Sequence, residues 1–250
     1  MRADHTPPQP DMDSIGPDHG LSLDRRRMLI KGGLSGFLLP MLLMSAQPVG
    51  AQSTAPTPPR ILVFGDSLTE GFGLSPRDGL VPSLGRWLRA RGHVSTLRNA
   101  GLSGDTTYGG RVRINWSLRR GQDAVIIELG ANDLLMGWAV ADIEKNLDVI
   151  LDRAKAGGRP VLLVGIAPPD DNQPKAEAIR AMWQRLALRH DVLLIADLYA
   201  PIWASPGSKR AALLQKDGLH LSAKGVDLVV DQLLGPKVIQ LLDEIRPQRP

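Results

Sequence analysis

The 250-residue chain contains no cysteine and has few aromatic residues. Without cysteine it has no disulfide, no thiol nucleophile, no cysteine-based metal site and no lipidated N-terminal cysteine. The same absence suits a protein that works in an oxidising compartment without relying on disulfides. Aromatic residues make up 4% of the chain and hydrophobic residues 43%. The composition therefore predicts one sizeable, mainly aliphatic core.

Long runs of one charge sign are also missing. The formal net charge is +4, but the Lys and Arg residues are scattered along the chain. Scattered basic residues indicate a solvated surface, so we expect no nucleic-acid partner. The chain also has no P-loop and no Gly-x-Gly-x-x-Gly after a predicted strand, which argues against nucleotide binding.

The N-terminal 51 residues have the features of an export signal. Residues 1–23 are polar and rich in Pro and Gly, which predicts disorder. Arg26 and Arg27 then stand in a twin-arginine pattern, and the apolar stretch 32–46 is shorter than the span of about 20 residues that a membrane helix needs. Val49-Gly50-Ala51 offers a cleavage site. We expect export by the twin-arginine translocase to the periplasm or the medium, with an uncleaved membrane anchor as the alternative.

The remaining chain divides into a Pro-rich linker, 52–59, and one domain, 60–250. Continuous apolar runs predict strands that are buried on both faces, at 60–64, 93–99, 123–128, 160–166 and 192–197. Helical patterns alternate with them, at 80–91, 110–119, 138–156, 173–189 and 223–245, the last interrupted at Gly235-Pro236. Alternating strands and helices predict an α/β fold, with a parallel sheet covered by helices on both faces.

Ser67 is the candidate nucleophile. It follows the first predicted strand in the stretch Gly65-Asp66-Ser67-Leu68. The carboxyl ends of parallel strands form the edge where ligands bind in open α/β sheets. We expect Asp66 to accept backbone hydrogen bonds that hold this turn. The stretch lacks the Gly-x-Ser-x-Gly of an α/β-hydrolase nucleophile elbow, because Thr69 stands where the second glycine is required.

A serine hydroxyl needs a neighbouring base to become a strong nucleophile. The predicted domain has three histidines, of which His93 and His190 begin or precede predicted strands and so lie at the opposite edge of the sheet. His220 is therefore the candidate base. Asp217, three residues earlier, is close enough to accept a hydrogen bond from the other ring nitrogen and to fix its tautomer.

Acyl transfer also requires donors for a developing oxyanion. We expect three: the backbone N–H groups of Ser67 and Gly104 and the side-chain amide of Asn132. Gly104 lies in Leu102-Ser103-Gly104-Asp105, and Asn132 follows the third predicted strand in Gly130-Ala131-Asn132-Asp133. Each stretch alone also fits an ordinary turn.

Together these stretches resemble blocks I, II, III and V of the SGNH (GDSL) hydrolase family, with Ser67, Gly104, Asn132 and His220 at the four invariant positions. The similarity spans nearly all of the predicted domain and is strongest to bacterial acyl-CoA thioesterase/lysophospholipase/arylesterase members. It implies a flavodoxin-like α/β/α sandwich with five parallel strands, no metal and no cofactor. It also implies a serine esterase that acts on small-molecule or lipid esters, with transient contact with membrane lipid.

Two departures concern the substrate: Leu221 stands where thioesterases have proline, and the stretch 199–215, with Trp203, has no match. The alternatives are a carbohydrate O-acetyl esterase, which a polar open cleft would indicate, and a binding module on the same scaffold. Four side chains after Asn132 either line an acyl pocket or pack in the core: Leu134, Leu135, Met136 and Trp138. We expect Trp87, Trp116 and Trp183 to be core or half-buried.

Overall fold

The structure is a computed structural model that describes residues 57–119, 121–167 and 173–245. All of them belong to the compact unit Thr54–Pro250. The predicted signal segment, 1–51, lies outside the described residues. In the described part of the chain, no helix combines the length and apolar character that a membrane crossing requires.

Five parallel strands form a single sheet in the order β2-β1-β3-β4-β5. They are β1 (Arg60–Gly65), β2 (Thr96–Gly101), β3 (Ala124–Glu128), β4 (Val161–Val164) and β5 (Leu193–Ile195). This order is that of flavodoxin-like folds, in which the topology switches between β1 and β3 and ligands bind at the carboxyl ends of those strands. The predicted α/β class and the five-stranded parallel sheet are confirmed.

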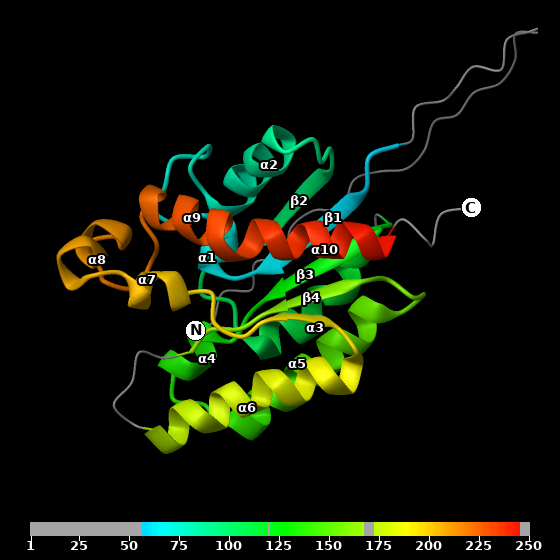
Figure 1. The fold of residues 1–250 in the computed structure, drawn as a ribbon. Coiled ribbons are helices and arrows are strands. Elements are labelled where there is room, and N and C mark those ends of the chain that lie inside the picture. The colour runs from blue at the N-terminus through cyan, green and yellow to red at the C-terminus, as the bar shows by residue number, and fades with distance from the viewer. Residues whose placement is uncertain (1–56, 120, 168–172, 246–250) are drawn as a thin grey trace, which may run out of the picture. The chain divides into compact units, whose positions relative to one another are not determined.

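One face of the sheet is covered by α2 (Leu80–Ala90), α9 (Ala223–Val229), a π-helical turn η1 (Val230–Leu234) and α10 (Gly235–Ile245). Alternate strand residues such as Ile61, Val63 and Ile126 point into this layer. Figure 1 shows α2, α9 and α10 together on this side of the sheet.

The opposite face is covered by α3 (Thr107–Leu118), α5 (Val140–Lys155) and α6 (Gln173–His190), which pack on Leu62, Phe64 and Val125. Because both faces are buried, the strands alternate between two apolar layers rather than between core and solvent. The fold is thus a three-layer sandwich, with the helix layers on either side of the sheet (Figure 1).

Four short helices follow the carboxyl ends of β1, β3 and β5 or the loops beyond them. They are α1 (Ser67–Glu70), α4 (Ala131–Leu135), α7 (Ala200–Ala204) and α8 (Gly207–Leu213). None was expected from helical periodicity, because four to seven residues are too few to show it. Figure 1 shows α1, α4, α7 and α8 toward one end of the sheet.

The structure corrects several boundaries. The strand predicted at 93–99 begins only at Thr96, because His93 N–H still bonds the α2 carbonyl of Leu88. The helix predicted from 110 begins at Thr107, since the Thr106 side chain caps it by accepting Gly109 N–H. The expected interruption at Gly235-Pro236 is confirmed. The turn before it widens to a π-helix, because proline lacks an N–H and its ring clashes with the preceding turn.

The expectation for the tryptophans is wrong in one case. Trp183 is fully buried and Trp87 is partly buried, but Trp116 is 67% exposed on the outer face of α3. Helical periodicity assigns Trp116 to a helix without saying which face meets the sheet.

Truncation of Leu147 tests the packing of α5 on the sheet. Leu147 is fully buried. We expect Leu147→Ala to lower the free energy of unfolding by about 2–5 kcal/mol, because the lost contacts leave a cavity. Urea unfolding measures this change. Leu188→Ala on α6 removes the same atoms from a side chain that is 83% exposed, and an equal loss in this control would contradict the assignment of the core.

Candidate active site

Ser67 begins α1, directly after β1. The Asp66 side chain caps this helix by accepting the N–H of Leu68 at 3.1 Å, as expected from the sequence. The helix is only four residues long, and Gly71 caps its end with a positive φ of 92° that allows the chain to turn back. The Ser67 side chain is thereby held at the carboxyl edge of the sheet.

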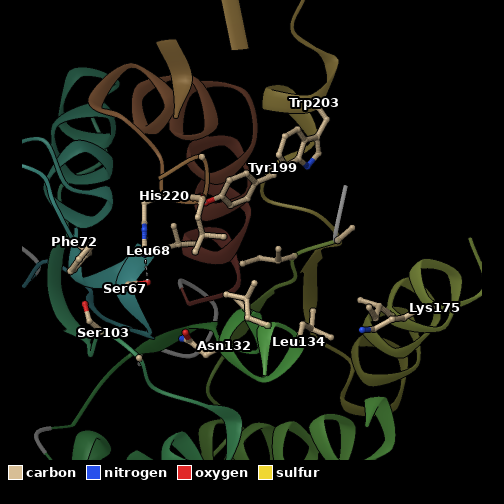
Figure 2. Close-up of a pocket in the computed structure, with 18 residues that line it drawn as sticks. Ser67, Leu68, Phe72, Ser103, Asn132, Leu134, Lys175, Tyr199, Trp203 and His220 are labelled. Atoms are coloured by element: carbon tan, nitrogen blue, oxygen red, sulfur yellow. Dashed lines mark hydrogen bonds between the residues drawn. The ribbon is translucent and has the colours of Figure 1, made fainter. Parts of the chain in front are cut away.

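His220 and Asp217 reach this edge from the loop between α8 and α9. The Nε2 atom of His220 lies 2.9 Å from Ser67 Oγ, and its Nδ1 atom lies 2.7 Å from Asp217 Oδ2. Asp217 Oδ1 accepts the N–H groups of Leu219 and His220. The structure therefore joins the three residues in one hydrogen-bonded chain, with the carboxylate fixed by its own loop. Figure 2 shows the link between Ser67 and His220.

Two aromatic side chains that sequence reasoning did not assign to the site hold the His220 loop. The Phe72 ring lies 4.8 Å from the His220 ring, centroid to centroid. The Tyr199 hydroxyl donates to the carbonyl oxygen of Leu219 at 2.7 Å, and its ring stacks on Trp203. The only available signal for Tyr199 was its place in the stretch 199–215.

The expected oxyanion donors gather at the same cavity. Ser67, Gly104 and Asn132 all line it together with His220. Gly104 has a φ of 78°, and open space lies where a side chain would be, so its backbone can face a ligand. The Asn132 amide donates to the carbonyl oxygen of Asp105 at 2.8 Å, which orients the side chain. Figure 2 shows Asn132 at the cavity.

Buried polar contacts hold the surrounding loops. Asp133 is fully buried and accepts both the N–H and the hydroxyl of Thr107, which ties α4 to α3. Arg113 forms an ion pair of 2.7 Å with Asp105 and donates to the carbonyl oxygens of Gly65 and Ala100. One guanidinium thus joins the ends of β1 and β2 to the Gly104 loop.

The carboxyl groups of the site have displaced pKa values. The hydrogen bond with His220 and the N–H of Leu219 lower the pKa of Asp217 to about 2, so it is ionised at neutral pH. Burial raises the pKa of Asp66 to about 6, partly opposed by the Leu68 N–H. Burial also raises the pKa of Glu128 well above its usual value. The sequence pattern did not indicate Glu128 as a site residue.

The cavity beside Ser67 has a volume of about 380 Å³, within the range of small-molecule sites. Its walls are mainly carbon, contributed by Leu68, Leu134, Ile166, Ile179 and Trp203. Within the described ranges, the His, Asp and Glu side chains form no group of three suited to a metal ion.

Of the four side chains after Asn132, two line the cavity. Leu134 and Leu135 do so, while Trp138 packs in the core against the α5 layer. Met136 does neither, because it is 61% exposed at the end of α4.

The two histidines that were excluded as the base for Ser67 lie away from it, as expected. His190 ends α6, where its ring bonds Asp148 at 2.8 Å, and His93 precedes β2.

The chain is similar in sequence to known proteins. Residues 63–228 match the GDSL-like lipase/acylhydrolase family. The esterase TesA of Pseudomonas aeruginosa is 34% identical over 78% of this chain and 89% of its own. Thioesterase 1/protease 1/lysophospholipase L1 of Escherichia coli K12 is 29% identical over 68% and 79%.

The chain is also similar to solved structures. The crystal structure of AlinE4, an SGNH-hydrolase family esterase, superposes with a TM-score of 0.60 at 32% identity. The superposition covers 75% of this chain and 99% of that one.

The lowered pKa of Asp217 predicts a pH-dependent contribution to stability. Its ionised form is favoured in the folded state, so the contribution is present above pH 3.8 and is lost as the pH falls toward about 2. We expect the melting temperature of the wild type to fall relative to Asp217→Asn over that window, and the difference to be constant above about pH 5. A difference that does not change with acidification would contradict the assignment.

Proposed function

The chain belongs to the GDSL-like lipase/acylhydrolase family, and from this premise we propose that it is an exported serine esterase that acts through Ser67, His220 and Asp217. The observation that carries the proposal is the continuous hydrogen-bonded chain from Asp217 through His220 to Ser67, at the edge of an apolar cavity. We assign this activity to the domain 60–250.

In the first half of the reaction, Ser67 Oγ attacks the ester carbonyl carbon. His220 Nε2 removes the hydroxyl proton, and Asp217 stabilises the imidazolium that forms. The carbonyl oxygen becomes an oxyanion, which accepts from the backbone N–H groups of Ser67 and Gly104 and from the Asn132 amide. The proton on His220 then passes to the leaving alcohol or thiol, and an acyl-enzyme remains.

In the second half, water replaces the leaving group. His220 accepts a proton from the water as it attacks the acyl carbon, and the same three donors hold the second oxyanion. Collapse releases the acid and returns the proton to Ser67 Oγ. The two half-reactions therefore use one set of groups and leave the enzyme unchanged.

The cavity supports apolar or aromatic ester groups as substrates. Walls formed by Leu134, Ile179 and Trp203 offer few polar partners for a sugar. We therefore favour aryl and short-chain esters and lysophospholipids, with acyl thioesters accepted in vitro, over the O-acetyl groups of cell-envelope glycans. The name of the Escherichia coli relative includes both thioesterase and lysophospholipase, which supports the same range.

Export completes the proposal. Arg26 and Arg27, the apolar stretch 32–46 and the small residues before position 52 support a twin-arginine signal. The enzyme would then work in the periplasm or outside the cell, where lysophospholipids and other esters are available and acyl-CoA is not.

Lipid contact is supported by the rim of the cavity. Five exposed apolar side chains make up this rim. Phe72, Leu135 and Leu219 line the cavity itself, and Leu102 and Met136 are next in the chain to the lining residues Ser103 and Leu135. A lipid ester that entered along this surface would exchange one apolar environment for another. We infer that the rim rests transiently on lipid aggregates.

A panel of p-nitrophenyl esters from acetate to palmitate tests the reaction. We expect the purified 52–250 protein to hydrolyse the esters and Ser67→Ala to lose several orders of magnitude in kcat, because the nucleophile is gone. The chain-length profile reports the usable depth of the apolar cavity. Full activity in Ser67→Ala would overturn the assignment. No activity on any ester from a folded wild type would favour the glycan deacetylase, and then a binding role.

Polar substitutions on the rim test the lipid contact. Leu102 and Met136 belong to the rim but do not line the cavity. In Leu102→Gln/Met136→Gln we expect the ratio of activity on micellar palmitate ester to activity on soluble acetate ester to fall about tenfold. Partial burial of two such side chains is worth on the order of 1.4 kcal/mol.

Leu188→Gln is the matched control, because Leu188 is equally apolar and exposed but lies near the end of α6, away from the cavity. An unchanged ratio in the rim variant, or an equal fall in Leu188→Gln, would exclude a specific role of the rim.

A further inference from the structure

Two carboxyl groups are buried together beneath the nucleophile. Asp66 follows β1, and Glu128 is the last residue of β3, where it pairs with Gly65. Asp66 is 0% and Glu128 1% exposed. Gly65 makes room for this arrangement, since a Cβ atom there would lie 2.7 Å from Glu128 Oε2 and 2.1 Å from Thr69 Oγ1.

The hydrogen bonds of Glu128 are incomplete for a carboxylate. Thr69 Oγ1 donates to Glu128 Oε2 at 2.8 Å, and the backbone N–H groups of Asp66 and Thr69 also lower the pKa of this carboxyl. Among the described residues, Oε1 nevertheless has no hydrogen-bond partner. The side chain of Glu128 is instead a hydrogen-bonding neighbour of the Asp66 carboxyl. Two carboxylates cannot hydrogen-bond to each other, so one of the two must carry a proton.

The charges around Asp66 and Glu128 do not remove the need for a proton on one of the two carboxyl groups. Asp105 adds a further negative charge, but Arg113 is paired with it. His220 lowers the pKa of Asp66, and burial keeps the Tyr199 hydroxyl neutral, so it adds no negative charge. In the described part of the chain, no cation is among the groups that shift the pKa of Glu128. Two buried negative charges side by side would therefore be strongly unfavourable.

We propose that Glu128 holds one proton for the pair at neutral pH and donates it to Asp66, which makes Glu128 a positioning residue for the oxyanion donors. Asp66 stays ionised and is the better acceptor, because it receives the Leu68 N–H on Oδ1. Its Oδ2 atom lies 3.4 Å from the Asn132 amide nitrogen. Glu128 does not touch the substrate and acts only through Asp66.

This arrangement links the protonation of Glu128 to the geometry at Ser67. The Asp66 carboxylate holds the first turn of α1, from which the Ser67 N–H projects, and it borders the Asn132 amide. With the proton in place, Asp66 is held by the Glu128 O–H, and the pair carries a single charge. Loss of the proton at alkaline pH would release Asp66 and add a second negative charge near the developing oxyanion, which opposes the reaction.

Infrared spectroscopy tests whether Glu128 is protonated, and it needs no substrate. We expect the wild type at pH 7 to show the carbonyl stretch of a protonated carboxylic acid, and Glu128→Gln to lack it. Glu144→Gln is a suitable control, because Glu144 is ionised beside Arg185 and contributes no such band. A wild-type spectrum without the band would overturn the proposal even if the protein proves to be an active esterase.

Kinetics of two variants separate positioning from simple structural support. Glu128→Gln can donate to Asp66 through its amide and accept from Thr69, so we expect near wild-type kcat at pH 7. It has no proton to lose, so the decline of kcat at alkaline pH should move to higher pH or disappear. Glu128→Met has similar size but no hydrogen bonds, and we expect its kcat to fall about 100-fold with little change in KM, as for a misplaced catalytic group.

These kinetic readouts rest on the proposed esterase activity, whereas the infrared band does not. Equal losses in Glu128→Gln and Glu128→Met, or a wild-type pH profile in Glu128→Gln, would contradict a role for the shared proton. If Glu128→Met does not fold, the comparison of Glu128→Gln with the wild type still decides, because both keep the hydrogen-bond pattern.

Discussion

The hydrogen bond between Ser67 Oγ and His220 Nε2 joins residues that are 153 positions apart in the chain. The arrangement of the whole sandwich determines its length of 2.9 Å. β1 delivers Ser67 to the carboxyl edge of the sheet, and α9, η1 and α10 anchor the far side of the His220 loop in the core. The bond therefore depends on how α2, α9 and α10 pack on the same face of the sheet.

The surroundings of this bond divide into a rigid polar base and an apolar opening. Below Ser67, fully buried polar groups are paired with one another, as in Asp133 with Thr107 and Glu128 with Thr69. Above it, the cavity and its rim are carbon surfaces such as Leu134 and Phe72. A polar base fixes geometry because each buried group has few alternative partners. An apolar opening accepts varied groups, because dispersion and burial do not depend on direction.

Local sequence features were enough for much of the fold. Runs such as Val161-Leu162-Leu163-Val164 are continuous and short, which is typical of strands buried on both faces, and β4 lies where this run predicted a strand. The start of β2 was predicted three residues too early, at His93, although the His93 N–H bonds the carbonyl of Leu88 near the end of α2. The burial of Trp116 was predicted wrongly, and the sequence left open whether Met136 lines the pocket or packs in the core. The reason is related: burial depends on what the neighbouring layer covers and not on the residue type alone.

The sequence by itself determined the chemistry that is available: a serine after a buried strand, one histidine at a suitable place, an aspartate three residues before it, and a glycine and an asparagine after strands. Such residues identify a reaction because their side-chain chemistry and spacing are local properties. Only the tertiary structure decided which groups meet. It placed the Phe72 ring against the His220 ring, joined Tyr199 to Leu219 and enclosed Glu128 beside Asp66. These contacts follow from the strand order and from the packing of separate layers, and the sequence pattern could place groups at the same edge of the sheet but could not show which side chains touch there.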